Sequence, residues 1–323
     1  MVSSIDRDQE IFRDIFSSSS FEARQKITEK GRFAYYTTAS TAHLILRNQE
    51  LWMRNTAIMN DFTEVEHGLR CLIAAYTSPA GDELIAAMDS IFPGVSSEWS
   101  ALFNSWIPVI KNNTYILSVS EHLQSEDLHG RLSMWRAYGG NAGVAFIFNG
   151  GPMFRPSDAL KAYSSPVHYL DHDGVIGEIK KITKGLLQHS EYLKKKDKEL
   201  LKNAMFETFR FAAICTKHPA FLEEREWRLI STQLLHNSNR LKLSPELIGG
   251  VSQLVLKLKL ENVPEEGLYG VSIPEVVDRI LIGPCEHPEV IASSMASLLE
   301  LNGVENPWAK IHITRVPLRP NQR

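Results

Sequence analysis

Cysteine is scarce in this sequence of 323 residues. The three cysteines, Cys71, Cys215 and Cys285, are far apart and form no Cys-x-x-Cys pair. Their spacing provides neither the paired thiols of a structural metal site nor those of a redox motif. Because unpaired cysteines are simplest to keep in a reducing compartment, we expect a cytoplasmic protein.

Long apolar runs and an excess of charge of one sign are also missing. No run approaches the roughly 20 apolar residues that span a bilayer. The first 20 residues carry acids within their apolar pattern, unlike the core of a signal peptide. The formal net charge of −3 gives no general electrostatic attraction to nucleic acid or an anionic membrane. We therefore expect no signal peptide and no membrane partner.

Several catalytic signatures are absent as well. There is no Walker phosphate loop, no Gly-x-Ser-x-Gly elbow and no His-Glu-x-x-His helix. The glycine-rich segment "YGGNAG" precedes a predicted strand instead of opening a helix, which argues against a Rossmann dinucleotide loop. The 11 histidines are scattered without the spacing of metal ligands, so we expect no metal site.

The periodicity of apolar residues predicts an α+β protein with a mixed central sheet, because helices come in groups instead of alternating strictly with strands. We predict an N-terminal helical segment over 1–30. A single α+β domain over 31–323 is expected to follow, with helical insertions around 61–112 and 175–215. The predicted strands are 32–40, 51–55, 114–120, 144–148, 165–170, 224–230, 253–263, 276–284 and 309–319.

The stretch "FLEEREWRLI" places charged residues inside a predicted strand. Side chains of a strand alternate between its two faces, so Trp227 and Leu229 can share a core face. Glu224, Glu226 and Arg228 would then share the other face, each about 7 Å from the next along the strand. Such a face is either a solvated sheet edge or a functional site.

Polar and aromatic side chains also gather at the ends of other predicted strands. We take four further patches as candidates for ligand binding. They are Tyr36, Thr37 and Thr38 at the end of the first strand; Asn60, Asp61 and Glu64 before a helix; Ser118 and Ser120; and Trp135 with Tyr138, one helical turn apart.

Each patch also has a purely structural interpretation. Asp61 and Glu64 fit a helix capping box. Trp135 and Tyr138 have the character of core aromatics. Thr38 is placed to cap the helix that follows the first strand. The charged residues of "FLEEREWRLI" can pair with one another as an internal network.

Five short motifs, taken in order, resemble a known family. They are "YYTTASTAHLILRNQELWMRNTAIMNDFTE", "LSVSEHL", "SMWRAYGGNAGVAFIF", "FLEEREWRLI" and "ILIGP". They are similar to the motifs of the bacterial family called domain of unknown function 2971, over roughly residues 33–317. The sequence departs from the family pattern at Phe62, where the family usually has proline.

The layout of that family looks like that of ADP-ribosyltransferases of the DarT-like and diphtheria-toxin-like kind. Those enzymes have a first strand with aromatic and Ser/Thr residues, a helix directly after it, and a late strand with a catalytic glutamate. In one branch this glutamate lies in Glu-x-Glu, whose letters match Glu224-Arg225-Glu226. The resemblance implies an ADP-ribosyltransferase-like fold, NAD as substrate, and transfer of ADP-ribose or hydrolysis of NAD.

The candidate residues suit this chemistry. Glu226 would stabilise the oxocarbenium-like ribosyl cation, while Glu224 would orient or deprotonate the acceptor. Arg228 would hold the two carboxylates or a phosphate. The aromatic side chains would hold the nicotinamide ring, and the hydroxyl and amide side chains its amide and the ribose. A toxin or phage-defence effector fits such an NAD consumer, and the acceptor is left open among protein, nucleic acid, small molecule and water.

Two other classes of function remain open. A non-catalytic protein that binds a nucleotide or a partner would use the same residues as structural networks. A nuclease would need clustered carboxylates such as Glu224, Glu226 and Asp61 around a divalent metal ion. Arg228 stands where a lysine would be more useful for a nuclease.

Overall fold

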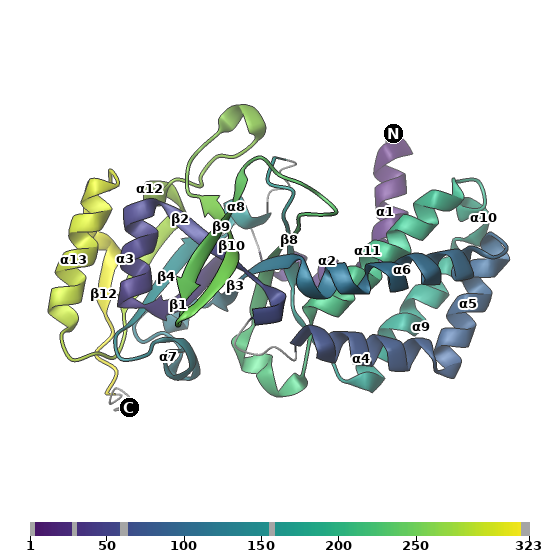
Figure 1. Ribbon diagram of the computed structural model, residues 1–323, viewed down its shortest axis with the longest axis horizontal. Coiled ribbons are helices and arrows are strands. Elements are labelled where there is room, and N and C mark those ends of the chain that lie inside the picture. Colours follow the sequence, from purple (N-terminus) through teal and green to yellow (C-terminus); the bar gives the residue numbers. More distant parts are fainter. Residues whose placement is uncertain (1–3, 28–30, 59–63, 155–158, 318–323) are drawn as a thin grey trace. The chain divides into compact units, whose positions relative to one another are not determined.

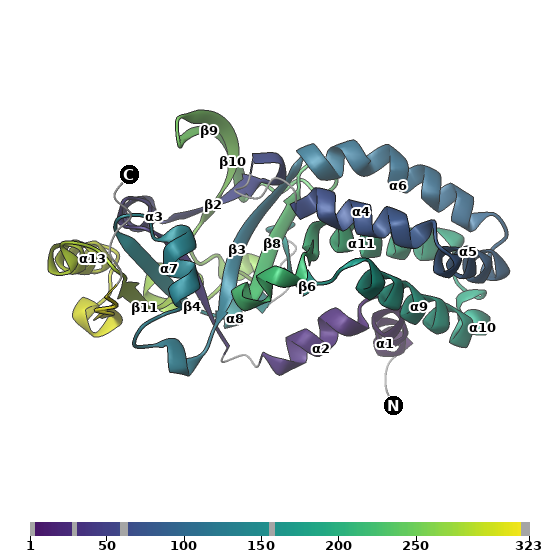
Figure 2. The ribbon, with the colours of Figure 1, turned by 90° about the horizontal axis from the view of Figure 1, so that it is seen from below.

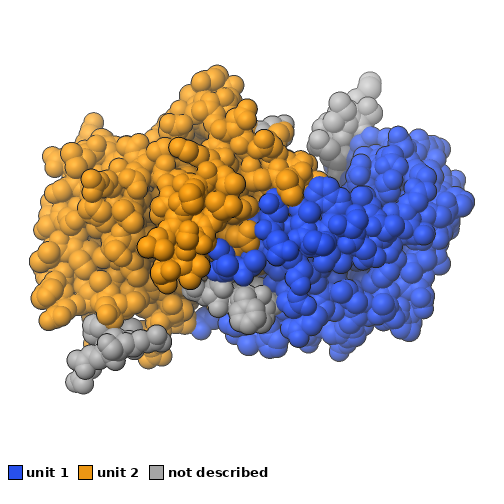
Figure 3. All heavy atoms as spheres, in the orientation of Figure 1, with its two compact units in different colours: residues 1–26, 56–114, 165–223 blue, residues 27–55, 115–164, 224–323 orange. Residues whose placement is uncertain are grey.

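The computed structural model describes residues 4–27, 31–58, 64–154 and 159–317 (Figure 1). Contacts between Cα atoms divide the chain into two compact units, each built from three separate segments (Figure 3). Unit 1 comprises residues 1–26, 56–114 and 165–223; unit 2 comprises residues 27–55, 115–164 and 224–323. The helical insertions predicted around 61–112 and 175–215 fall within unit 1.

Unit 1 is helical. Its helices are α1 (Ser4–Phe16), α2 (Ser18–Lys26), α4 (Glu64–Tyr76), α5 (Pro79–Ile91), α6 (Val95–Asn112), α9 (His172–Gln188), α10 (Ser190–Leu193) and α11 (Lys198–Cys215). Shorter elements are η1 (Thr56–Ile58), η3 (Pro219–Glu224), whose last residue belongs to unit 2, and the parallel strands β6 (His168–Tyr169) and β7 (Thr216–Lys217). Figure 2 shows the long helices from a second direction.

Aromatic side chains form much of the core between α4, α6 and α11. Trp99 lies at the centre, with its ring centroid 4.6 Å from that of Phe209 and 5.4 Å from that of Tyr76. Phe103, one helical turn beyond Trp99 on α6, packs against Phe206 and Phe209 of α11. Offset and edge-on aromatic pairs of this kind add to the stabilisation from burial alone.

Unit 2 is built around a ten-stranded sheet, of which only the end residues of β3 and β5 belong to unit 1. Its strands are β1 (Arg32–Thr38), β2 (Glu50–Asn55), β3 (Thr114–His122), β4 (Gly143–Asn149), β5 (Tyr163–Pro166), β8 (Glu226–Thr232), β9 (Leu241–Ile248), β10 (Val251–Lys259), β11 (Val277–Ile282) and β12 (Ile311–Ile313). The main order is β12-β11-β4-β1-β3-β2-β10-β9, and β8 pairs with both β3 and β5. β11 and β12 are parallel, whereas β1, β3 and β4 are antiparallel neighbours.

The helices of unit 2 are shorter than those of unit 1. They are α3 (Ala39–Asn48), α7 (Leu132–Tyr138), α8 (Gly151–Phe154), α12 (Ile273–Val276) and α13 (Pro288–Leu301), with the 3-10 turns η2 (Gln124–Glu126), η4 (Pro264–Glu266) and η5 (Pro307–Lys310). Unit 2 therefore has the predicted α+β class with a mixed central sheet. No helix among the described residues is both long and apolar enough to cross a membrane.

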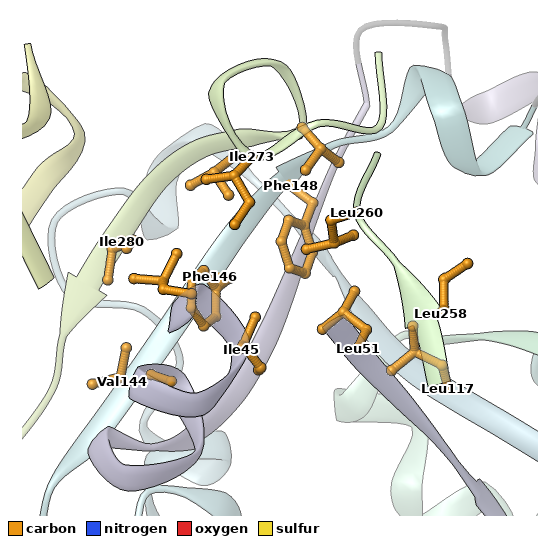
Figure 4. Close-up of a cluster of buried hydrophobic side chains, with 14 of the residues drawn as sticks. Ile45, Leu51, Leu117, Val144, Phe146, Phe148, Leu258, Leu260, Ile273 and Ile280 are labelled. Atoms are coloured by element: carbon orange, nitrogen blue, oxygen red, sulfur yellow. The ribbon is translucent and has the colours of Figure 1, made fainter. Parts of the chain in front are cut away.

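The two faces of the sheet carry different side chains, because strand residues alternate. One face bears Tyr35, Phe146 and Leu117, and packs against α3 and α13 in the large apolar cluster of Figure 4. The opposite face bears Ala34 and Tyr36 and packs against α7 through Met134 and Trp135. We call these the apolar face and the α7 face.

Three glycines make room for the indole of Trp135 on the α7 face. A Cβ atom added to Gly130, Gly143 or Gly283 would lie 2.9, 3.0 or 2.6 Å from the nearest atom of this ring. The three glycines come from different segments of the chain. Because the backbone at each of these positions lies so close to the Trp135 ring, the fold requires a residue without a Cβ atom there.

The hairpin of β9 and β10 was not predicted. Gly249 and Gly250 form its two-residue turn, with φ of +57° and +80°, which matches a type I′ hairpin. β9 contains Pro245 and is the edge strand at one end of the main strand order. Proline is compatible with an edge strand but weakens the strand signal in a sequence, which explains the omission.

Substitution of Gly283 by alanine should test the packing around Trp135. The new methyl group would lie 2.6 Å from Trp135 Cζ3. We expect Gly283→Ala to lower the free energy of unfolding by about 1–3 kcal/mol through overpacking. Urea denaturation followed by tryptophan fluorescence measures this change.

Gly177→Ala in α9 is the matched control, because no atom lies within 4 Å of the added methyl group. A helix-interior glycine costs roughly 0.5–1 kcal/mol relative to alanine, so this variant should be as stable as the wild type or more stable. Equal destabilisation by the two variants would contradict the packing argument.

Candidate functional site

Strand alternation assigns Glu226 and Arg228 of β8 to the α7 face of the sheet. Leu229 belongs to the cluster of the apolar face. Trp227 lies on that face too, where its ring packs 5.8 Å from that of Phe33 and its Nε1 donates a 2.8 Å hydrogen bond to Glu121 Oε1. Residues 226 and 228 therefore point to the opposite side, which also bears Tyr36.

Glu226 and Arg228 form a buried, two-pronged ion pair. Arg228 Nε donates to Glu226 Oε1 at 2.8 Å, and Arg228 Nη2 donates to Glu226 Oε2 at 3.1 Å. The side chain of Arg228 is 0% exposed and that of Glu226 is 6% exposed. The charged face of β8 is thus an internal site and not a solvated sheet edge. The fork geometry fixes the plane of the carboxylate.

Glu224 does not share this strand face, in contrast to the expectation from simple alternation. It ends η3, and Arg225 between the two glutamates has a φ of +45°. This left-handed residue breaks the alternation before β8 begins at Glu226. The carbonyl oxygen of Glu224 accepts a 3.0 Å hydrogen bond from Arg131 Nη1.

Ser118 and Ser120 of β3 also lie on the α7 face. Ser120 is the register partner of Ala34, and Leu117 beside Ser118 belongs to the apolar face. Ser118 Oγ is buried and has no hydrogen-bond partner among the described residues. A buried hydroxyl without a partner is unusual and marks a place where a ligand group could bind.

Tyr36 is a buried residue with a defined partner. Its hydroxyl oxygen accepts a 2.8 Å hydrogen bond from the backbone N–H of Arg131. Its ring packs edge-on against Trp135, with centroids 4.8 Å apart. Burial raises the pKa of Tyr36 to about 12, although the bond from Arg131 opposes the rise. The phenol therefore stays neutral throughout the physiological range.

Trp135 and Tyr138 lie on α7 over the sheet. Trp135 is 2% exposed and its Nε1 donates a 2.7 Å hydrogen bond to the carbonyl oxygen of His129. Tyr138 is partly buried against the same cluster. Both positions agree with the interpretation of these residues as core aromatics. Trp135 supports Tyr36 from the side of the helix.

The remaining candidates lie at the end of β1, at the start of α4 or outside the described residues. Thr38 is the N-cap of α3 and accepts a 3.3 Å hydrogen bond from the Thr41 backbone N–H, while Thr37 lies one residue earlier on the apolar face of β1. Glu64 is the first residue of α4 in unit 1. Asn60 and Asp61 lie outside the described residues.

Arg131 and Glu126 are central to the site, although neither was among the residues predicted from the sequence. Arg131 Nε donates to Glu126 Oε1 at 3.1 Å, and Arg131 Nη2 donates to the carbonyl oxygen of Glu121 at 2.8 Å. Arg225 also pairs with Glu126. Because these partners are up to 99 positions apart, no local motif reveals them. Arg131 connects Tyr36, the end of β3 and the start of β8.

A second ionic network adjoins Glu126 at the end of β3. His122 Nε2 lies 2.9 Å from Asp127 Oδ1, which also contacts Arg32 Nη2 at 2.9 Å. Burial lowers the pKa of His122, although its bond to Asp127 opposes this shift. Burial alone would raise the pKa values of Asp127 and Glu126, but hydrogen bonds and nearby arginine charges outweigh it and lower both. Among the described residues, no group of three or more His, Cys, Asp and Glu is arranged to hold a metal ion.

The Glu226–Arg228 pair should respond differently to single and double substitution. Glu226→Leu leaves the buried cation of Arg228 without its carboxylate, so we expect a loss of about 3–5 kcal/mol in the free energy of unfolding. The double variant Glu226→Leu/Arg228→Met should recover most of this loss, since apolar residues can replace both charges. Urea denaturation of the three proteins measures both effects. Equal stability of the single variant and wild type would show that the pair is not desolvated.

The stability of the folded protein should fall as the pH falls. His122 has a lower pKa folded than unfolded, so the unfolded chain binds more protons below about pH 6.5 and stability is lost there. The lowered pKa values of Glu126 and Asp127 have the same sign and add a further loss below about pH 4.5. Melting temperatures between pH 8 and pH 4 measure this dependence.

His122→Gln keeps a donor toward Asp127 but does not titrate. The decline between pH 7 and pH 5.5 should be shallower in this variant. It should not vanish, because burial also lowers the pKa of His168. An unchanged decline would assign the titration to another group.

Comparison with known proteins gives one match. Residues 134–229 match the family model described as "Protein of unknown function (DUF2971)". This range includes Trp135, Tyr138, Glu224, Glu226 and Arg228, and covers less than a third of the chain. Neither the curated proteins nor the solved structures include a match. This part of the chain is therefore similar to the DUF2971 family, in agreement with the resemblance of the motifs that it contains.

Proposed function

We propose that unit 2 binds NAD and cleaves its nicotinamide–ribose bond, as an ADP-ribosyltransferase or an NAD glycohydrolase. The observation that supports this proposal most is the Glu226 carboxylate, held in a fixed plane by Arg228 on the sheet face that also bears Tyr36 and Ser118. An ADP-ribosyltransferase-like fold and a role as a toxin or defence effector belong to the same proposal.

Cleavage of this bond passes through an oxocarbenium-like ribose, so a fixed negative charge beside the ribose stabilises the transition state. Nicotinamide leaves with the bonding electron pair. The new bond to the ribose carbon forms from the oxygen of water, or from an oxygen or nitrogen atom of another acceptor. The proton of the acceptor passes to a base; Glu224 stays a prediction for this role, because it does not share the strand face of Glu226. The ion pair with Arg228 keeps the Glu226 carboxylate oriented.

The neighbouring residues suit recognition of the nicotinamide half of NAD. Ser118 Oγ, buried and without a protein partner among the described residues, can donate to or accept from an amide group. Ser120 on the same face is a second hydroxyl for the ribose. Tyr36 is held by Arg131 and Trp135, so we assign it to shaping this face. Thr37, Thr38, Asn60, Asp61 and Glu64 stay predictions from the resemblance.

A non-catalytic protein that binds a nucleotide or a partner is the second candidate. The observation in its favour is that Glu226 and Arg228 satisfy each other in a buried setting, as in a structural ion pair. The two functions differ in whether Glu226 is needed for turnover.

Release of nicotinamide from NAD, measured by chromatography, tests the proposal. Glu226→Gln keeps the size of the side chain and removes its charge. We expect kcat to fall about a hundredfold to a thousandfold, as when one well-placed electrostatic stabiliser is lost. Glu300→Gln, at an exposed position of α13, is the matched control and should leave kcat unchanged.

The double variant Glu226→Leu/Arg228→Met separates loss of activity from loss of folding. It should melt near the wild-type temperature, and its kcat should fall at least as far as that of Glu226→Gln. A kcat close to that of the wild type in this folded double variant would refute the catalytic role of Glu226. A wild-type protein that binds NAD in calorimetry without releasing nicotinamide would favour the non-catalytic candidate. Magnesium-dependent cleavage of DNA or RNA would favour a nuclease.

A further inference from the structure

Arg225 has an unusual backbone conformation for its residue type. Its φ is +45°, in the left-handed region that side chains with a Cβ atom rarely adopt. Helices often end in this conformation, but glycine or asparagine normally occupies the position. Arg225 follows η3 and directly precedes Glu226. A strained residue persists only where its surroundings hold it, and such residues concentrate at functional sites.

The chain on both sides of Arg225 is held by hydrogen bonds. Before it, the carbonyl oxygen of Glu224 accepts from Arg131 Nη1 at 3.0 Å. On the C-terminal side of the Arg225 Cα atom, the carbonyl oxygen of Arg225 accepts a 2.9 Å hydrogen bond from the Glu121 backbone N–H. The two peptide groups that flank the left-handed residue are thus tied to α7 and β3. We call Glu121, Glu126, Arg131 and Arg225 the β8 anchor.

The side chain of Arg225 completes this anchor. Its Nη2 pairs with Glu126 Oε1, and Glu126 is itself fixed by Arg131 Nε at 3.1 Å and by the Leu123 backbone N–H at 3.0 Å. Glycine would adopt the same φ without strain but would lack this contact. The presence of arginine at a position suited to glycine therefore points to a role for the guanidinium.

The conformation of Arg225 decides which face of the sheet Glu226 occupies. A shift of one residue in a strand moves every side chain to the opposite face. Here such a shift would move the Glu226 carboxylate to the apolar face and the Trp227 ring to the α7 face. The β8 anchor holds the chain at Arg225, directly before Glu226, and so sets the face on which the Glu226 side chain lies.

We infer that Arg225 is a positioning residue for Glu226: its left-handed backbone and its ion pair with Glu126 set the register of β8 that presents the carboxylate on the α7 face. This inference rests on the proposed function for its link to catalysis. It adds a contact outside the reacting groups, since the guanidinium of Arg225 pairs with Glu126.

Arg225→Gly and Arg225→Lys separate the two parts of the anchor. Glycine keeps the backbone conformation and loses the ion pair, whereas lysine keeps a charge toward Glu126. For Arg225→Gly we expect kcat for nicotinamide release to fall about tenfold or more with KM for NAD changed less than about twofold, because small displacements of a catalytic group lower turnover. Arg225→Lys should restore most of the loss.

Gln49→Gly is the matched control. Gln49 is also a left-handed residue, with φ of +53°, but it is the C-cap of α3 and does not contact the β8 anchor. This variant should leave both kcat and KM unchanged. A wild-type kcat in Arg225→Gly would overturn the positioning role while leaving the proposed function in place.

Hydrogen exchange of backbone amides tests the anchor without any activity. In Arg225→Gly the amides of Glu226, Trp227 and Arg228 should exchange about tenfold faster or more than in the wild type, as expected for local opening. The amides of β10 should be unaffected. If wild-type protein releases no nicotinamide, the proposed function fails, and this exchange pattern alone decides on the anchor. Unchanged exchange in β8 would overturn it.

Discussion

The hydrogen bonds of Arg131 are the interaction on which the arrangement of the candidate site depends. Its backbone N–H binds the Tyr36 hydroxyl, and its guanidinium binds Glu126 and the carbonyl oxygens of Glu121 and Glu224. One largely buried residue thus connects β1, β3 and the start of β8. Buried charge-assisted hydrogen bonds are stronger than exposed ones, and leaving their partners unsatisfied is costly. Loss of Arg131 would disturb several strands together.

The two faces of the sheet of unit 2 carry different side chains, and the candidate site lies on only one of them. The apolar face is packed with aliphatic and aromatic side chains against α3 and α13, where burial supplies most of the stabilisation. The α7 face has a smaller apolar cluster, which includes Tyr36, and also carries Ser118 and the Glu226–Arg228 pair. Because side chains alternate along β1, β3 and β8, each of these strands contributes residues to both faces. The polar groups are therefore held by strands whose larger apolar core lies on the opposite face of the sheet.

Much of the fold could be predicted from local sequence patterns. β-Branched and aromatic runs marked strands such as β1 and β3, and alternation of apolar and charged residues marked β10. Grouped apolar periodicity marked the long helices. β9 was missed because Pro245 interrupts its pattern, although the glycine pair that follows is a hairpin signal.

The candidate site was only partly predictable, for physical reasons. The shared face of Glu226 and Arg228 follows from alternation within one strand. The position of Glu224 does not, because the left-handed Arg225 breaks that alternation. The links from Arg131 to Tyr36 and Glu224 join residues more than 90 positions apart, and a single sequence carries no record of such pairings.

The division of the chain has a consequence for how this protein can be dissected. Since each unit consists of three segments, the polypeptide passes from one to the other five times. No single truncation point yields either unit intact, and a cut in one connection leaves four others joining them. Each unit must also assemble from successive segments separated by roughly 30 to 60 residues of the other unit, which raises contact order and slows folding. Isolated halves would best be made by replacing whole inserted segments with short linkers.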